Sequence, residues 1–373
     1  MVQQQPQQLH TPTPEERPAQ LARWPWKLFF AFLALYVLTS RGHTGSIDEE
    51  SLLYASSRIV HAALGMFNVA WPLQEPSPGV FNLFTTYEPA QPVLAVPFYL
   101  VGSLVASFFP LESQTYVTRL IVTLFGAVVS AATVARLYQV GRTLGQASAA
   151  ATFMAITYGV GTLAWPYART FFREPLTAFA LVSGAYAMLC LQEGGNWRQA
   201  AVSWGWVLLG VMTKLAAVFT VPIFAVYFAR IYLPRRRSDH GPSETQAGAK
   251  WHSGWVMAAA AGVLIIVLAG IVFQDRWKQI GPYLSQIGLF TGDFSYVGTA
   301  LYGLTLSPGK GLLVFAPPVL AGLAGLYLLF WQRSAEALLI AVLALVFIFV
   351  YSLNPSWHGG ATWGPRYLLP VLP

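Results

Sequence analysis

Long apolar segments separated by short polar links make up most of the chain. A helix rises about 1.5 Å per residue, so roughly 20 apolar residues cross the hydrocarbon core of a bilayer. After a first apolar run in 23–42, segments of about this length lie near residues 90–109, 118–138, 147–166, 175–192, 200–213, 215–233, 253–273, 311–330 and 335–353. The pattern predicts an all-α fold, a polytopic transmembrane bundle of about nine spanning helices that covers residues 23–373.

The chain begins with a polar segment. Residues 1–22 are rich in Gln and Pro, which predicts a disordered cytoplasmic tail. The first apolar run is short enough for a signal peptide, and that is the alternative interpretation. However, the polar segment before it is long, no A-x-A-like cleavage site follows, and Trp24 and Trp26 resemble interfacial anchors. We therefore interpret it as a first spanning helix with the N-terminus in the cytoplasm.

Positively charged links set the expected orientation. They are 139–146, 193–199, 234–252 (with Arg235, Arg236 and Arg237) and 331–334. Because cytoplasmic links of membrane proteins are rich in Lys and Arg, we expect all of them, including the long loop 234–252, in the cytoplasm. That arrangement requires one early apolar segment not to cross the membrane.

Residues 90–109 are the segment that we expect not to cross. Prolines flank and interrupt it at positions 89, 92, 97 and 110. Proline breaks the hydrogen-bond ladder of a helix, as in re-entrant or interfacial segments. Residues 40–117 then form one large outer loop that carries amphipathic and re-entrant helices. In the alternative, 90–109 crosses the membrane and the first apolar run does not.

Composition supports the membrane assignment. Only 10% of the residues are charged and 55% are hydrophobic, whereas about 25% of a typical soluble domain is charged. A surface with so few charges has to face the lipid bilayer. The single Cys190 excludes an intrachain disulfide or a cysteine-based zinc site. The net charge of +7 fits basic cytoplasmic helix ends, so no nucleic-acid partner is implied.

Carboxylates are scarce, and three are consecutive near the start of the outer loop. The chain has 15 Asp and Glu residues, and Asp48, Glu49 and Glu50 precede an amphipathic stretch. Acids in the first turn of a helix commonly stabilise its N-terminus, and we favour this role for Glu50. Asp48 and Glu49 are candidates for a general base that deprotonates a hydroxyl or an amine.

A further acid and several cations fall on the same face. Glu174 follows Arg173 and opens the next span. Lys214, Lys310 and Arg366, the last with His358 nearby, are expected at the same boundary. Isolated Lys and Arg near helix ends usually extend to the lipid headgroups. Together, however, these cations predict an anionic ligand, since arginine binds phosphate with two hydrogen bonds and lysine adds a point charge.

Motifs for other chemistries are missing from the sequence. SPGKG at 307–311 lacks the spacing of a P-loop, and HExxH, CxxC and GxSxG do not occur. The six histidines show no metal-ligand spacing.

The chain carries a series of short motifs in a defined order. They are Asp48-Glu49 after the first helix, Tyr87-Glu88-Pro89 before an apolar loop helix, Glu174-Pro175, Thr213-Lys214, SPGKG, and WGPRYLLP at 363–370. In order and membrane placement they resemble the membrane-embedded C-type (GT-C) glycosyltransferases. The group most similar contains the protein O-mannosyltransferases and the lipid A aminoarabinose transferase. The resemblance covers nearly the whole chain from residue 23.

The resemblance implies an inverting glycosyltransferase of the plasma membrane. Such an enzyme moves a sugar from a polyprenyl-phosphate carrier to a protein, lipid or glycan acceptor on the extracytoplasmic face. It assigns Asp48 as the general base, with Glu49 and Glu174 as further catalytic acids. The residues expected to bind substrate are Glu88, Arg173, Lys214, Lys310, His358 and Arg366. Some members of the wider fold use a divalent cation, for which Asp48, Glu49 and Glu174 are the candidate ligands.

Members of this group continue beyond the WGPRYLLP motif into further helices and often an outer domain. One expectation is therefore that the chain is a fragment that lacks these parts.

Two other functions fit a polytopic membrane protein. The first is a non-catalytic transporter or carrier of a lipid-linked substrate. Transporters place ionisable groups near the bilayer midplane, within broken helices of paired repeats. Here the acids lie in surface loops, and the sequence has no evident repeat. The second is a non-enzymatic assembly protein, for which the Asp48 carboxylate would be dispensable.

Overall fold

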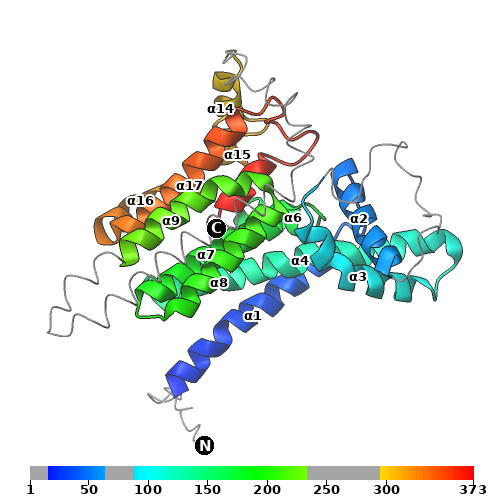
Figure 1. The fold of residues 1–373 in the computed structure, drawn as a ribbon, viewed down its shortest axis with the longest axis horizontal. Helices are drawn as coiled ribbons and strands as arrows, with labels where there is room; N and C mark the ends of the chain where they lie inside the picture. The colour runs from blue at the N-terminus through cyan, green and yellow to red at the C-terminus, as the bar shows by residue number, and fades with distance from the viewer. Residues whose placement is uncertain (1–15, 64–86, 233–294) are drawn as a thin grey trace, which may run out of the picture.

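The computed structural model describes residues 16–63, 87–232 and 295–373 (Figure 1). All regular structure in these ranges is helical, and they contain no strand. The predicted all-α class is confirmed for this part of the chain. The predicted tail 1–22 is only partly described, and α1 (Glu16–Leu38) already begins within it.

Three helices of the described part are long and apolar enough to cross a membrane. They are α4 (Leu111–Thr143), α7 (Glu174–Gln192) and α17 (Ser334–Ser352). Shorter apolar helices occur at Trp24–Leu38, Ala90–Ala106, Leu215–Ile231 and Val319–Gln332. These helices are those of a helical membrane protein, but the described ranges do not contain about nine spanning helices as predicted. The apolar segment 253–273 and the loop 234–252 lie outside the described residues.

Side-chain hydrogen bonds and prolines explain why some predicted spans are shorter. The segment 147–166 forms α5 (Ser148–Gly161) and α6 (Ala164–Ala168), separated by an extended Thr162. The Thr162 hydroxyl donates to the carbonyl of Tyr158 and accepts from the N–H of Ala164, at 2.7 and 3.1 Å. It therefore ends one helix and begins the next.

The segment 311–330 is also interrupted, in this case by prolines. Pro317 and Pro318 separate α15 (Leu312–Phe315) from α16 (Val319–Gln332), because proline cannot donate to the helical ladder. Residues 215–233 begin as a 3₁₀ turn, η1 (Leu215–Phe219), which continues into α9 (Thr220–Tyr232).

The α3 helix (Ala90–Ala106) packs along the first part of α4, with α2 (Ile47–Ala63) beside it (Figure 1). The pair approaches closely at Gly102, where an added Cβ would lie 3.2 Å from the carbonyl oxygen of Thr118. Pro97 lies inside α3 without ending it. The segment 90–109 is thus a helix of 17 residues, and whether it crosses the membrane stays a prediction.

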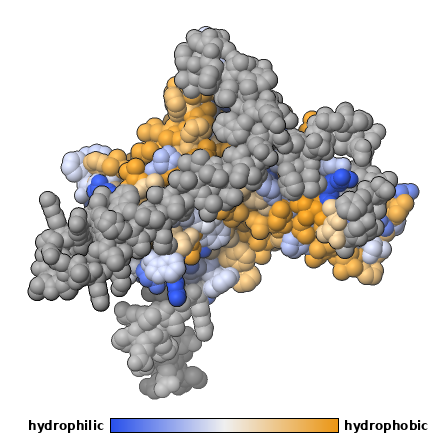
Figure 2. All heavy atoms as spheres, in the orientation of Figure 1, coloured by the Kyte–Doolittle hydropathy of each residue, from blue (hydrophilic) through white to orange (hydrophobic). Residues whose placement is uncertain are grey.

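The remaining helices form a bundle beside α4. The α7 helix pairs with α8 (Trp197–Thr213), while α9, α16 and α17 lie together along one side of that pair (Figure 1). Phe224 of α9 packs near Gly184 of α7, where an added Cβ would be 3.4 Å from its ring. Figure 2 shows apolar side chains facing outward over the α16–α17 and α3–α4 pairs, as expected of helices in contact with lipid.

Several chain turns meet at one end of this bundle, which we call the α2 end. There α1, α5, α8 and α17 finish and α7 begins. Tyr36 near the end of α1 donates to the carbonyl of Gly159 in α5 at 2.9 Å. At the opposite end Arg333, before α17, pairs with Glu193, after α7, at 2.8 Å. The α7 helix, with 19 residues or about 28 Å of rise, separates the two ends.

Candidate functional site: an ion-pair cluster at the α2 end

Asp48 and Arg366 form a partly exposed ion pair at the α2 end. Asp48 lies in the first turn of α2, and Arg366 opens the 3₁₀ helix η2 (Arg366–Val371). Arg366 Nη2 lies 2.7 Å from Asp48 Oδ2, and the Tyr87 hydroxyl donates to Asp48 Oδ1 at 2.6 Å. Burial and this bond to a carboxylate raise the pKa of Tyr87, which keeps it protonated as a donor. The Asp48 side chain is 27% exposed, so a ligand can reach it.

Glu174 and Lys214 form a second, buried ion pair beside the first. Lys214 Nζ lies 2.7 Å from Glu174 Oε1, and both side chains are more than nine-tenths buried. Arg366 Nε lies 4.0 Å from the same oxygen, which connects the two pairs. Glu174 Oε2 is buried without a hydrogen-bond partner in the described part of the chain.

Aromatic rings surround the cations. Lys214 Nζ lies 4.4 Å from the centre of the Tyr367 ring and 5.1 Å from that of Tyr351. The Arg366 guanidinium lies 4.7 Å from the centre of the Phe172 ring. Burial opposes the charge of Arg366, but Glu174, Tyr367 and Asp48 hold its pKa above the usual value. Arg366 therefore remains charged although it is only 8% exposed.

Backbone geometry explains how Arg366 reaches this place. The loop before it contains Gly359 with φ of +67°, a conformation that glycine adopts without strain. A Cβ at Gly359 would also lie 3.1 Å from Arg366 Nε, so glycine leaves room for the guanidinium. Lys310 fastens the same loop by donating to the carbonyls of Gly360 and Thr362, at 2.9 and 2.5 Å.

His358 lies in the loop that leads to Arg366, and Lys310, from the turn before α15, binds this loop. Burial, and then the charge of Arg366, lower the pKa of Lys310. His358 Nδ1 accepts the N–H of Gly360 at 3.0 Å. Both residues hold backbone groups of the loop, and neither pairs with a carboxylate among the described residues.

Glu88 and Arg173 contact residues that adjoin both ion pairs. They form an ion pair, and Glu88 Oε1 also accepts the N–H of Leu215 at 2.9 Å. This bond fixes the chain directly after Lys214, where the backbone is extended at the end of α8. Arg173 lies 4.5 Å from the centre of the Tyr87 ring, the same tyrosine that donates to Asp48. Both residues were predicted to bind substrate. In the structure they contact each other, Leu215 and Tyr87, and substrate binding stays a prediction.

Glu49 has a different environment from Asp48. It is 2% exposed and accepts the N–H groups of Phe171 and Gly45, each at 2.8 Å. It therefore joins the start of α2 to the link before α7. Glu50, in contrast, pairs with Arg119 at 3.1 Å and accepts the hydroxyl of Thr44, as a structural residue would.

The described residues contain no group of three or more His, Cys, Asp or Glu side chains that could hold a metal ion. The metal site considered from the sequence, with Asp48, Glu49 and Glu174, is therefore not formed. The reason is that the Glu49 carboxylate is held by backbone N–H groups and the Glu174 carboxylate by Lys214.

The enclosing aromatic residues Tyr87, Tyr351, Tyr367 and Phe172 were not among the predicted site residues. With 17 Tyr and 24 Phe in the chain, no spacing distinguishes these from lipid-facing rings. Arg41 and Arg169 were also missed, because neither adjoins another charged residue in the sequence.

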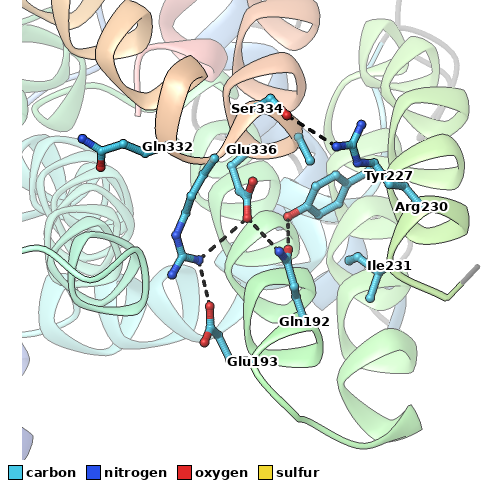
Figure 3. Close-up of a pocket in the computed structure, with 10 residues that line it drawn as sticks. Gln192, Glu193, Tyr227, Arg230, Ile231, Gln332, Ser334 and Glu336 are labelled. Atoms are coloured by element: carbon cyan, nitrogen blue, oxygen red, sulfur yellow. Dashed lines mark hydrogen bonds and ion pairs between the residues drawn. The ribbon is translucent and has the colours of Figure 1, made fainter. Parts of the chain in front are cut away.

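A separate cavity of about 530 Å³ lies at the opposite end of the bundle (Figure 3). It lies between the ends of α7 and α9 and the turn from α16 to α17. Its charged lining residues are Glu193, Arg230, Arg333 and Glu336, two of each sign. Because these charges balance, the cavity does not by itself favour a charged ligand.

No model of a known protein family matches the chain, and no curated protein matches its sequence. The function therefore has to be inferred from the ion-pair cluster at the α2 end.

Proposed function

We propose that the chain is a GT-C-like membrane glycosyltransferase that uses a lipid-phosphate-linked sugar. The observation that supports this most is the Asp48–Arg366 ion pair beside the buried Glu174–Lys214 pair. A partly exposed carboxylate next to two cations, at the end of the membrane helices, suits a reaction between a lipid phosphate and an acceptor. In this proposal the chain is a multi-pass plasma-membrane protein with the α2 end on the extracytoplasmic face.

The reaction needs a base and a stabilised leaving group. Asp48 takes the proton from the acceptor hydroxyl or amine, whose oxygen or nitrogen forms a new bond to the anomeric carbon of the sugar. The bond from that carbon to the phosphate oxygen breaks, and the polyprenyl phosphate leaves with the electron pair. Arg366 and Lys214 stabilise the charge that develops on the phosphate.

In this proposal the contacts of Asp48 control when the base becomes available. Both Asp48 oxygens are engaged, one by Arg366 and one by Tyr87. A phosphate that binds Arg366 competes with Asp48 for the same guanidinium. Donor binding then releases the carboxylate next to the sugar, so the base is freed only when a donor is present.

The test is transfer by purified protein supplied with polyprenyl-phosphate sugars and candidate acceptors, with products analysed by mass. Asp48→Asn keeps the size and one hydrogen-bond acceptor but removes the base. Loss of a general base lowers rates by roughly 10²- to 10⁴-fold, and we expect that loss here. Glu50→Gln is the matched control and should retain most activity, because Glu50 is held by Arg119 and Thr44. A fully active Asp48→Asn protein would contradict the assignment.

A carrier of lipid-linked substrates is the second candidate. Interrupted helices at Thr162 and at Lys214 favour it, because broken helices with charged residues form the binding sites of many transporters. A carrier predicts saturable binding of the lipid phosphate but no new glycosidic product, whichever acceptor is supplied. The product analysis therefore separates the two functions.

A further inference from the structure

Four cations near the α2 end each pair with a carboxylate. Ion pairs within 4.0 Å join Glu50 to Arg119, Glu88 to Arg173, Glu174 to Lys214, and Asp48 to Arg366. Two arginines of the same region differ from these. Within the described ranges, no carboxylate lies within 4.0 Å of the guanidinium of Arg41 or Arg169.

One of the two unpaired arginines contacts the link that carries the other. Arg41 belongs to the link between α1 and α2, and Arg169 follows α6. Arg169 Nη1 donates to the carbonyl of Thr39, at the end of α1, at 3.2 Å. Arg169 Nε is buried without a hydrogen-bond partner in the described part of the chain. Burial, and then the nearby charge of Arg41, lower the pKa of Arg169, which is the electrostatic sign of this proximity.

Glu49 lies near Arg41 but does not form an ion pair with it. A Cβ at Gly45 would lie 3.9 Å from Arg41 Nη1 and 3.8 Å from Glu49 Oε2, so the two groups face the same glycine. Glu49 Oε2, however, already accepts the N–H of Gly45 and the hydroxyl of Ser46, at 2.8 and 3.2 Å. The Arg169 guanidinium thus lies against the link that carries Arg41, and its Nε has no hydrogen-bond partner in the described part of the chain.

Like charges placed together repel each other, and an anion between them removes the repulsion. Arginine presents a planar fork of N–H donors that matches phosphate oxygens, and two such forks can hold a dianion. The position at the end of α1 is also the level at which phospholipid phosphates lie if α1 enters the bilayer. We propose that Arg41 and Arg169 form a phosphate-binding subsite that is separate from the Asp48–Arg366 pair.

This subsite does not depend on the proposed transferase activity. The phosphate belongs either to the headgroup of a bilayer lipid or to a water-soluble ligand, and the chemistry at the arginines is the same. The cavity in Figure 3 also contains two arginines, Arg230 and Arg333, but its lining includes two carboxylates, and both of these pair with Arg333. An arginine of this cavity therefore serves as the control in the binding test.

The test is calorimetric titration of the full chain in detergent with inorganic phosphate and, separately, with dihexanoyl phosphatidic acid. The variants are Arg41→Gln, Arg169→Gln and the double variant. Arg230→Gln is the matched control, since Arg230 is an exposed arginine at the opposite end whose contact is a 3.4 Å bond to Ser334. Each single variant should bind phosphate roughly tenfold more weakly, and the double variant should lose this binding component. Arg230→Gln should bind as the wild type does.

Two further comparisons make the result decisive. Arg169→Lys keeps a charge and a donor for Thr39, so it should fold and retain part of the affinity. Binding of both probes indicates that phosphate alone is recognised, whereas binding of phosphatidic acid alone assigns the subsite to a lipid headgroup. The proposal is overturned if the double variant binds both probes as the wild type does, or if Arg230→Gln loses as much. The titration does not measure transfer, so a failed transferase assay would not bear on this subsite.

Discussion

The buried pair of Glu174 and Lys214 allows a quantitative test of the site. Lys214→Met removes the ammonium group but keeps an unbranched side chain of similar length. The Glu174 carboxylate, with 3% side-chain exposure, is then left without its partner at 2.7 Å. Breaking a buried ion pair on one side costs about 3–5 kcal/mol, because an uncompensated charge remains. Arg366, 4.0 Å away, compensates in part, so we expect about 3 kcal/mol of lost stability.

The double variant should recover much of this loss. In Lys214→Met with Glu174→Gln, no charge of the pair remains buried. Replacing both partners of a buried pair is often neutral, in contrast to removing one. We therefore expect the double variant to be at least about 2 kcal/mol more stable than Lys214→Met alone.

The assay is the free energy of unfolding in mixed micelles with increasing sodium dodecyl sulfate, for all members of the cycle. Glu193→Gln is the control, because it breaks the pair with Arg333 at nearly the same distance, 2.8 Å, but at a side chain that is 48% exposed. Such a pair contributes about 0–1 kcal/mol. The reasoning is refuted if Lys214→Met costs no more than Glu193→Gln, or if the double variant is no more stable than the single one.

Two further predictions concern packing and orientation. Gly126→Ala should cost at least about 3 kcal/mol of unfolding free energy, since its Cβ would lie 2.2 Å from a backbone carbonyl oxygen, whereas Gly205→Ala, with open space around it, should gain about 0.5–1 kcal/mol in the same denaturation assay. In a Cys190→Ser background, a cysteine at Gly45 should react with a membrane-impermeant thiol reagent from outside, and one at Gln146 only after permeabilisation. The reverse labelling would place the α2 end in the cytoplasm.

Helix positions were predictable where apolar runs end at charged or capping residues. The predicted segments 175–192 and 335–353 correspond closely to α7 and α17. The break within segment 147–166 was not predictable, because it depends on the Thr162 hydroxyl, and threonine occurs within helices as well. Hydrophobic periodicity does not record which backbone carbonyl a side chain donates to or which N–H it accepts from, so the division into α5 and α6 had no sequence signal.

The sequence predicted which residues belong to the site more readily than which acid pairs with which cation. Scarce carboxylates and unusual cations were recognisable one by one, and Asp48, Glu174, Lys214 and Arg366 do lie together. Which cation faces which acid depends on packing between segments distant in sequence, as for Asp48 and Arg366. Glu49 shows the limit, since adjacent acids of identical chemistry separate into a backbone acceptor and an ion-pair partner.

Competition for Arg366 distinguishes a phosphate site from a purely structural cluster. If Asp48 and a carrier phosphate bind the same guanidinium, Asp48→Asn should weaken transfer and at the same time strengthen binding of a polyprenyl phosphate that lacks sugar. The gain should be at most roughly tenfold, the lower end for a hydrogen bond between charged groups, because Asn still contacts Arg366. A structural cluster predicts the opposite, since removing the acid would loosen Arg366 and the loop that carries it. Opposite changes in affinity and in turnover, measured on one variant, therefore indicate that Arg366 exchanges the carboxylate for a phosphate.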